Sequence, residues 1–231
     1  MAELHKFVAT LRDALVKGAA SEPKHDASEH TLVPISLSAA RAEMVSRFAR
    51  ELEAVGGRFL GMLTPADAPA RIVAFARELG AKAVAIGQGV LCNPAPIADA
   101  LAAAGCAVLR TRSVDDASRS ATRDSVARAG LGIAEAHYAI ASTGTLAVVA
   151  EEARPASLTL LPPASLVLVH ASRLVADLAA ALDAIGPQLV ATRRISLITG
   201  PSRTADIEKR IVVGVHGPKT FAVAVIWPAN D

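Results

Sequence analysis

Residues 83–109, AVAIGQGVLCNPAPIADALAAAGCAVL, decide the fold class of this chain. The short apolar run Ala83–Ile86 ends at a glycine and is typical of a buried strand. Residues 97–104 have helical spacing and also end at a glycine, and a second short apolar run follows at 106–109. Because a strand, a helix and a second strand at this spacing form a right-handed parallel unit, the segment predicts an α/β protein.

Helices are predicted on the N-terminal side of this unit. Residues 4–15 carry one apolar stripe, and the polar, proline-containing stretch 19–31 that follows is expected to be a flexible loop. A second helix is expected after Ser38, since apolar residues recur on one face until a pair of glycines stops the pattern. A third is expected to begin at Thr64, whose hydroxyl can cap free N–H groups, and to end at Gly80.

Strands and helices continue to alternate through the C-terminal half. Helical spacing predicts a helix over 172–185 and a helix start near Thr204. Because no linker or internal repeat interrupts the pattern, residues 1–231 are expected to form one three-layer α/β domain. Its sheet should be largely parallel, with a mixed sheet as the alternative, and covered on both faces. The strands predicted in this half are 145–150, 157–161, 166–170, 195–199 and 221–227.

Composition and charge argue against several classes of function. The chain is 52% hydrophobic and carries 24 basic against 22 acidic residues with no basic tract, which argues against binding to nucleic acid. No apolar run approaches the roughly 20 residues of a membrane span, and the N-terminus is too polar for a signal peptide, so a cytoplasmic location is expected. The two cysteines, Cys92 and Cys106, lack the spacing of a metal or redox site. We therefore expect no metal and no bound cofactor.

The strongest site-like signal lies between residues 195 and 208. A predicted buried strand ends in a Gly-Pro turn and leads into the predicted helix start. Open parallel sheets bind ligands at the carboxyl ends of their strands, and helix N-termini attract anions. The alternative is that the hydroxyl side chains merely cap the helix and that the aspartate suits its first turn. The ligand-binding candidates are Gly200, Ser202, Arg203, Thr204 and Asp206.

Two further loops carry candidate ligand-binding residues. Ser142, Thr143, Gly144 and Thr145 combine hydroxyl groups with a glycine that lets the backbone approach a ligand, although a β-turn or bulge explains the same residues. In the second loop His216, beside Gly217, could titrate near neutral pH or reach a phosphate or carboxylate. A solvated loop histidine is the simpler interpretation. These patterns assign no catalytic residue.

Five short motifs rich in glycine, proline and hydroxyl side chains occur in order along the C-terminal half. They are AIASTGTL (139–146), SLTLLPP (157–163), ISLITGPS (195–202), TADIE (204–208) and GVHGP (214–218). Together they resemble the LUD-domain family over roughly residues 130–227. The resemblance implies a fold like that of the ribose-phosphate isomerase and CoA-transferase superfamily. It also implies a role beside two iron–sulfur partner proteins in oxidising L-lactate to pyruvate.

Two positions depart from the family pattern. Ser142 stands where the family usually has glutamate, and Ser165 where it usually has histidine, so each loses a group that could act as acid, base or nucleophile. The resemblance thus implies an accessory, non-redox component of an L-lactate oxidation system, acting with iron–sulfur proteins and holding a small anion. One alternative is an enzyme or binding protein for a phosphorylated or CoA-linked metabolite. Another is a structural scaffold whose glycine loops only shape the fold.

Overall fold

The computed structural model describes residues 37–89, 91, 95–111, 116–149, 156–189, 195–205, 211–214 and 216–227. They belong to one compact unit, Ser36–Asp231. The helix predicted over 4–15, the loop predicted over 19–31, Cys92 and Asp206 lie outside the described residues. That the whole chain forms one domain therefore stays a prediction.

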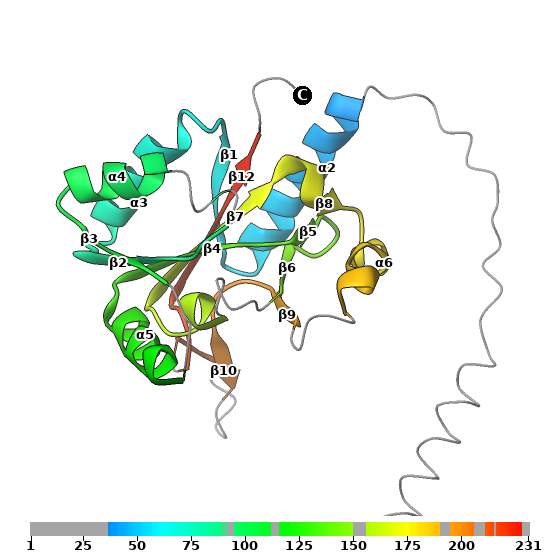
Figure 1. The fold of residues 1–231 in the computed structure, drawn as a ribbon. Coiled ribbons are helices and arrows are strands. Elements are labelled where there is room, and N and C mark those ends of the chain that lie inside the picture. The colour runs from blue at the N-terminus through cyan, green and yellow to red at the C-terminus, as the bar shows by residue number, and fades with distance from the viewer. Residues whose placement is uncertain are drawn as a thin grey trace, which may run out of the picture. The chain divides into compact units, whose positions relative to one another are not determined.

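Six strands form the main sheet (Figure 1). They are β1 Arg58–Leu63, β2 Ala83–Ile86, β3 Ala107–Arg110, β4 Leu131–Glu135, β7 Ala164–His170 and β12 Thr220–Ile226. The order across the sheet is β1-β12-β7-β4-β2-β3, and every neighbouring pair is parallel. The unit predicted from residues 83–109 is present as β2, α4 (Ala95–Ala103) and β3, which confirms the α/β fold class.

Helices cover both faces of this sheet and give the predicted three layers (Figure 1). On one face α3 (Ala68–Glu78) and α4 bury Phe75 and Leu101 against the strands. On the opposite face α2 (Leu37–Ala54) buries Phe48, and α5 (Asp116–Arg128) buries Val126. The central strands β7 and β12 are buried on both faces, as strands of a covered parallel sheet are expected to be.

An ion pair joins the start of β1 to the end of α3. The Arg58 guanidinium donates two hydrogen bonds to the Glu78 carboxylate, at 2.7 and 3.1 Å, and these bonds hold the pKa of Glu78 below its usual value. Both side chains are well exposed, so the pair contributes little to stability.

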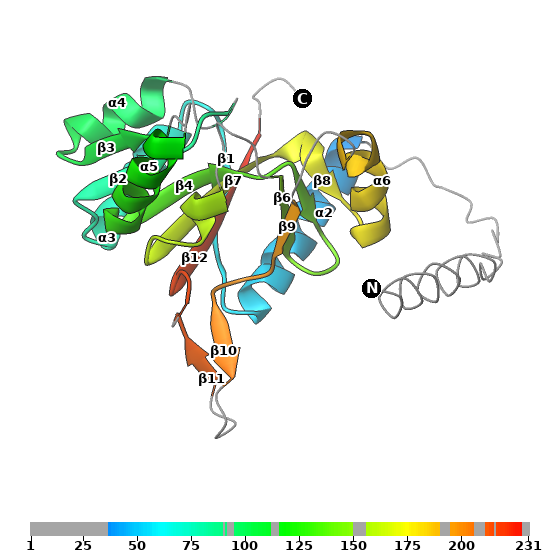
Figure 2. The same cartoon turned by 60° about the horizontal axis from the view of Figure 1, so that its bottom comes forward.

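A second, four-stranded sheet has the order β8-β5-β6-β9. Its strands are β5 Tyr138–Ile140, β6 Thr145–Val149, β8 Leu174–Val175 and β9 Ile195–Ile198. One face packs against α2 through Leu146 and Val148, and the other is covered by α6 (Leu178–Leu189) through Ile185. The antiparallel ribbon of β10 (Arg203–Ala205) and β11 (Ile211–Val213) projects from the two sheets (Figure 2).

The strand predicted over 157–161 is wrong. This segment contains a short 3-10 helix, η1 (Ala156–Thr159), which lies over β4 and buries Leu158 while Leu160 and Leu161 stay exposed. The reason is the sheet order: β4 and β7 already have a neighbour on each side, so their edges offer no backbone partner to another strand.

Three further predictions in the C-terminal half are corrected by strand pairing. The helix start predicted near Thr204 is wrong, because the segment is strand β10 and pairs with the β-branched residues of β11. The helix predicted over 172–185 begins only at Leu178, since a one-turn 3-10 helix, η2 (Ala171–Arg173), and strand β8 come first. The predicted buried parallel strand over 195–199 is β9, an antiparallel edge strand whose Leu197 is 48% exposed.

Candidate functional site

The predicted site loops meet near the end of α2, at the amino edge of the main sheet, the edge formed by the first residues of its parallel strands. The turn Ser142–Thr145 joins β5 to β6, and its Gly144 has a φ of 63°. Gly144 lies so close to α2 that a Cβ there would stand 2.3 Å from the backbone nitrogen of Leu52. Gly200, with a φ of 80°, packs on Val55 in the same way. Both loops are therefore held against the last residues of α2.

A row of threonine hydroxyls connects the first loop to the second. Thr143 Oγ1 donates to Thr145 Oγ1 at 2.7 Å, and Thr145 Oγ1 lies 2.7 Å from Thr199 Oγ1. Because Thr145 already accepts from Thr143, its own hydrogen can be given to Thr199. The neighbouring Ser142 is half-buried, and its N–H donates to the Ala176 carbonyl at 3.0 Å. These contacts tie the β5–β6 turn to β9 and to the segment after β8.

Ser202 connects the second loop to the third through its backbone. Its N–H donates to the Pro218 carbonyl at 3.1 Å, and its carbonyl accepts from the Gly214 N–H at 2.8 Å. Gly217 lies against it, since a Cβ on Gly217 would stand 2.9 Å from the Cβ of Ser202. The Arg203 guanidinium donates to the carbonyl of Val55, so it holds the end of α2. All three loops thus form one continuous assembly.

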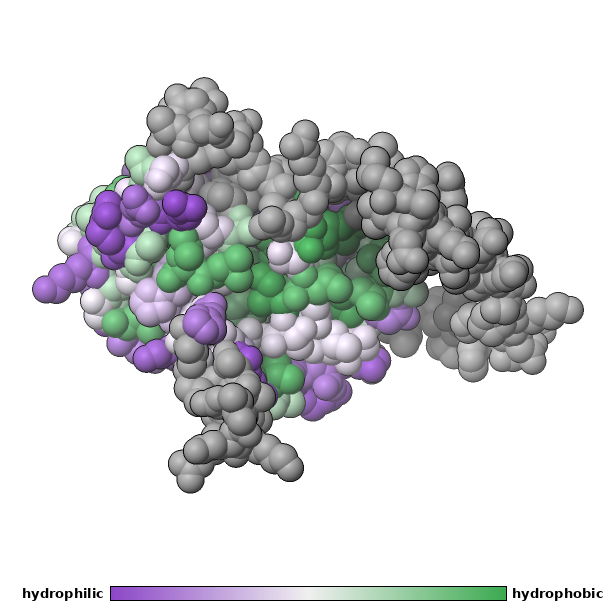
Figure 3. Space-filling model, turned by 90° about the horizontal axis from the view of Figure 1, so that it is seen from below, coloured by the Kyte–Doolittle hydropathy of each residue, from purple (hydrophilic) through white to green (hydrophobic). Residues whose placement is uncertain are grey.

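A pocket of about 470 Å³ opens at this edge, where β7 and β12 begin. The N–H groups of Lys219 and Thr220 both donate to the Pro163 carbonyl, at 2.8 and 3.2 Å, and so join the two approaches to the sheet. Figure 3 views the molecule from this side and shows apolar side chains gathered across its centre. The described lining residues are Leu160, Leu161, Pro163, Gly214, His216, Gly217 and Lys219.

The nitrogen-bearing side chains of the described lining are those of His216 and Lys219, which are both exposed. No acidic side chain is found among the described lining residues. An ammonium and an imidazole beside exposed leucines suit a small anion with an apolar part. Lys219 was not among the residues predicted from the sequence. The sequence feature that could have identified Lys219 is the run GPKT over 217–220, which ends like a phosphate-binding loop.

Two sequence-based predictions about the location of the site are wrong. The site lies at the amino edge of the parallel sheet, not at the carboxyl ends of its strands, because β9 belongs to the second sheet. Within the described residues 200–205 no helix begins after Gly200, since β10 takes that place, with Thr204 opposite Val212. Asp206 lies outside the described residues, so its role stays a prediction.

Ser165 lies in the core beneath this edge. It sits in β7 between Phe221 of β12 and Gly132 of β4, and it is fully buried. Its Oγ has no hydrogen-bond partner within the described part of the chain. A buried hydroxyl without a partner costs about 1 to 3 kcal/mol of desolvation, so this position carries a defect in the core.

We predict that Ser165→Ala raises the free energy of unfolding by about 1 kcal/mol, because it removes the uncompensated hydroxyl and leaves the packing almost unchanged. Urea unfolding at constant pH measures the change. Thr159→Val is the matched control. The buried Thr159 hydroxyl donates to the Ala156 carbonyl at 2.9 Å, so its removal should lower stability by about 1 kcal/mol. A lower stability of Ser165→Ala would mean that the hydroxyl has a partner in solution.

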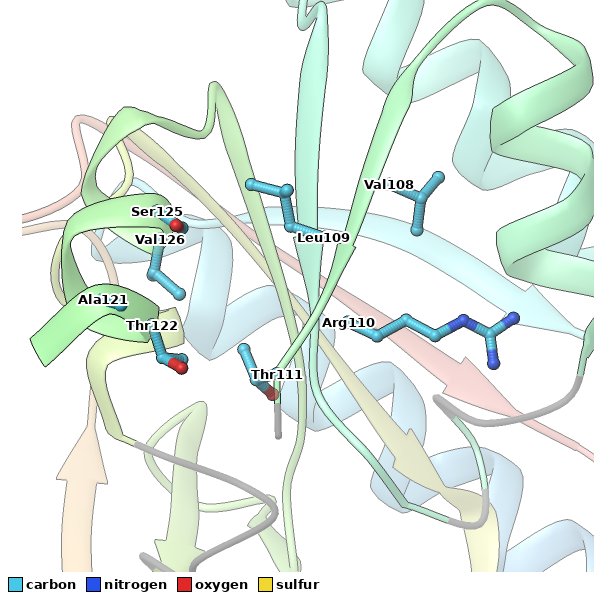
Figure 4. Close-up of a pocket in the computed structure, with 8 residues that line it drawn as sticks. All are labelled: Val108, Leu109, Arg110, Thr111, Ala121, Thr122, Ser125 and Val126. Carbon is cyan, nitrogen blue, oxygen red and sulfur yellow. The ribbon is translucent and has the colours of Figure 1, made fainter. Parts of the chain in front are cut away.

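A second cavity, of about 360 Å³, lies between α5 and β3, which is the outermost strand on one side of the main sheet. Figure 4 shows Thr111, Thr122 and Ser125 on the side of β3 that faces α5, whereas the Arg110 side chain extends from the opposite side of the strand. The Thr111 hydroxyl donates to the Ile86 carbonyl at 3.3 Å. Arg110 is also among the described lining residues of this groove, and the others are apolar or carry hydroxyl groups.

No three side chains of His, Cys, Asp or Glu lie close enough together to hold a metal ion in the described part of the chain. Among the described helices, none is both long and apolar enough to cross a bilayer.

Comparisons with known proteins give consistent matches. Residues 45–226 match the LUD domain family. "Lactate utilization protein C" of Macrococcus caseolyticus is 36% identical over 95 residues, which are 39% of this chain and 41% of that protein. The protein of the same name from an Exiguobacterium species is 36% identical over 118 residues, 48% of this chain and 50% of that protein. The matches thus span half or less of these relatives.

A solved structure shares the fold. The crystal structure of a DUF162 family protein from Deinococcus radiodurans superposes with a TM-score of 0.58. It is 20% identical in sequence, and the match covers 84% of this chain and 99% of that one. At this identity the likeness concerns the fold alone.

Proposed function

The chain belongs to the LUD-domain family, and on this basis we propose that it takes part in lactate utilisation as a non-redox accessory component that holds a small anion. The lactate role is supported by the names of the relatives that it matches. Binding of an anion is supported by the amino-edge pocket, because Lys219 and His216 are exposed in its lining.

The assignment of redox chemistry to partner proteins rests on the side chains available. The chain has two cysteines, and iron–sulfur clusters are usually held by four. Ser142 and Ser165 stand where the family usually has an acid and a histidine, so these positions bring neither a general acid nor a general base to this edge. We propose iron–sulfur proteins as the partners and a cytoplasmic location.

A dye-reduction assay tests the accessory role. The purified chain with L-lactate and an artificial electron acceptor should show no lactate-dependent reduction of the dye. Recovery of the tagged chain from its own cells grown on lactate should bring iron–sulfur proteins with it. Lactate oxidation by the chain alone would overturn the non-redox role, and recovery without such proteins would overturn the partnership.

The anion site has a variant that tests it. We predict that Lys219→Gln weakens binding of the preferred anion by about tenfold, because one charge-assisted hydrogen bond is lost. Calorimetric titration with L-lactate, pyruvate and inorganic phosphate measures the affinity, and the melting temperature should not change. Lys82→Gln, at an exposed lysine outside the pocket lining, makes the same change in net charge and is the control. Equal losses in both variants would mean that only overall charge matters.

The size of the pocket favours a second candidate function. A volume of about 470 Å³ exceeds what lactate needs, and exposed Leu160 and Leu161 add apolar surface. The same site therefore also suits a phosphorylated or CoA-linked metabolite, on which the chain would act or which it would bind. Tighter binding of a CoA ester than of lactate, with the same loss in Lys219→Gln, would favour this candidate.

A further inference from the structure

A separate pocket lies at the carboxyl edge of the main sheet, the edge formed by the last residues of the parallel strands. Its volume is about 310 Å³. It opens where β7 ends at His170 and β12 ends at Ile226, and the first residues of α3 and α4 close its other side. Parallel α/β sheets generally bind ligands at this edge. The described lining residues are Pro65, Ala68, Leu91, Pro96, Ile97, His170 and Ile226.

The lining is hydrocarbon with one polar exception. Among the described lining residues His170 has the single polar side chain. Apolar walls with few polar groups are typical of sites for small organic molecules, in which the polar group sets the orientation. The occupant should therefore have a hydrocarbon body and one hydrogen-bonding group.

Hydrogen bonds within η2 determine which nitrogen of His170 carries the proton. The backbone N–H of Ser172 donates to His170 Nδ1 at 3.2 Å, so Nδ1 must present a lone pair. Ser172 Oγ lies 2.7 Å from the same nitrogen and can only donate to it as well. The neutral ring then carries its hydrogen on Nε2. No partner for Nε2 is found among the described residues, so it is a hydrogen-bond donor available to a ligand.

The described lining favours a neutral ligand over an anion. It contains neither lysine nor arginine that could offset the charge of a bound carboxylate. A carbonyl oxygen, in contrast, can accept a hydrogen bond from Nε2–H without bringing a net charge into the pocket.

We propose that this pocket binds a small neutral carbonyl compound with an aliphatic or aromatic body, held by a hydrogen bond from His170 Nε2. The site is distinct from the amino-edge pocket and does not depend on the function proposed for it. The two pockets lie at opposite ends of the strands β7 and β12.

Three probes of similar shape test the proposal: acetophenone, benzoate and ethylbenzene. In an NMR titration of the full chain, acetophenone should shift the backbone signals of Leu91 and Ile97 and the ring signals of His170. It should bind about five- to tenfold more tightly than ethylbenzene, because one hydrogen bond contributes that factor to the affinity. It should also bind more tightly than benzoate. Preference for benzoate, equal binding of ethylbenzene, shifts confined to other regions, or no binding of acetophenone at 10 mM would each overturn the proposal.

Variants of His170 separate the hydrogen bond from the shape of the pocket. His170→Phe removes the donor and should abolish the preference of acetophenone over ethylbenzene. His170→Gln keeps an acceptor for the Ser172 N–H and a donor for the ligand, so it should restore the preference. His216→Phe, the same change in the amino-edge pocket, should leave the preference for acetophenone unchanged.

A preference that survives in a folded His170→Phe would overturn the role of Nε2. If that variant does not fold, the shift of the His170 Nε2 proton in the unaltered chain decides: acetophenone should move it, and no movement would overturn the proposal.

Discussion

Gly144→Ala is expected to lower the free energy of unfolding by about 4 kcal/mol. Two costs add. At a φ of 63° an alanine is strained by about 1 to 2 kcal/mol, and its Cβ would stand 2.3 Å from the backbone nitrogen of Leu52. Backbone cannot give way as a side-chain tip can, so either α2 or the β5–β6 turn must move, at the cost of an overpacked core. Chemical denaturation monitored by circular dichroism measures the loss.

Gly80→Ala separates the two costs. Gly80 also has a φ of 63°, and within the described structure no heavy atom lies within 4 Å of the place where its Cβ would stand. The control therefore carries the backbone strain without the clash, and it should lose only about 1 to 2 kcal/mol. Similar losses in both variants would mean that the contact between Gly144 and α2 is looser in solution than described here. The row of hydroxyls from Thr143 to Thr199 would then lack its support.

Gly132→Ala is expected to cost about 2 to 3 kcal/mol and also to weaken anion binding at the amino edge. Gly132 lies in the central strand β4 beneath η1, and a Cβ there would stand 2.2 Å from the Leu158 carbonyl oxygen and 2.9 Å from Pro162. Pushing η1 off the sheet overpacks the core. It also displaces Leu160 and Leu161, which line the pocket. Denaturation and calorimetric titration with the preferred anion measure the two effects.

Gly186→Ala is the control for this variant. Gly186 lies in α6, away from the pocket lining, and among the described atoms none lies within 4 Å of its Cβ position. Alanine favours a helix over glycine by about 1 kcal/mol, so stability should stay level or rise, and anion binding should not change. Loss of stability in Gly132→Ala with unaltered binding would separate η1 from the proposed anion site.

The candidate site shows what local patterns can and cannot locate. Hydroxyl and glycine clusters identified the three loops from the sequence, because such residues are typical of turns that approach other backbone closely. Lys219 was missed because its importance comes from position. It lies beside Pro163, more than fifty residues earlier in the chain, through a hydrogen bond that strand order alone makes possible.

The carboxyl-edge pocket could not be predicted for the same reason. In the sequence His170 is only the last residue of the predicted strand 166–170, and Leu91 and Ile226 are apolar residues like many others. Only the parallel order β1-β12-β7 brings the ends of these strands to one edge and places the starts of α3 and α4 over them.

The sequence by itself determined the α/β class, the β2–α4–β3 unit, α2 and the family, because these depend on periodicity and on motifs that lie within short stretches of chain. Strand partners depended on the tertiary structure. The apolar run of β9 reads like a parallel core strand, yet it pairs antiparallel with β6 in a second sheet, and residues 157–161 form η1 because β4 and β7 have no free edge. Backbone hydrogen bonding between distant segments decides such cases, and local sequence carries little information about which segment will supply the partner.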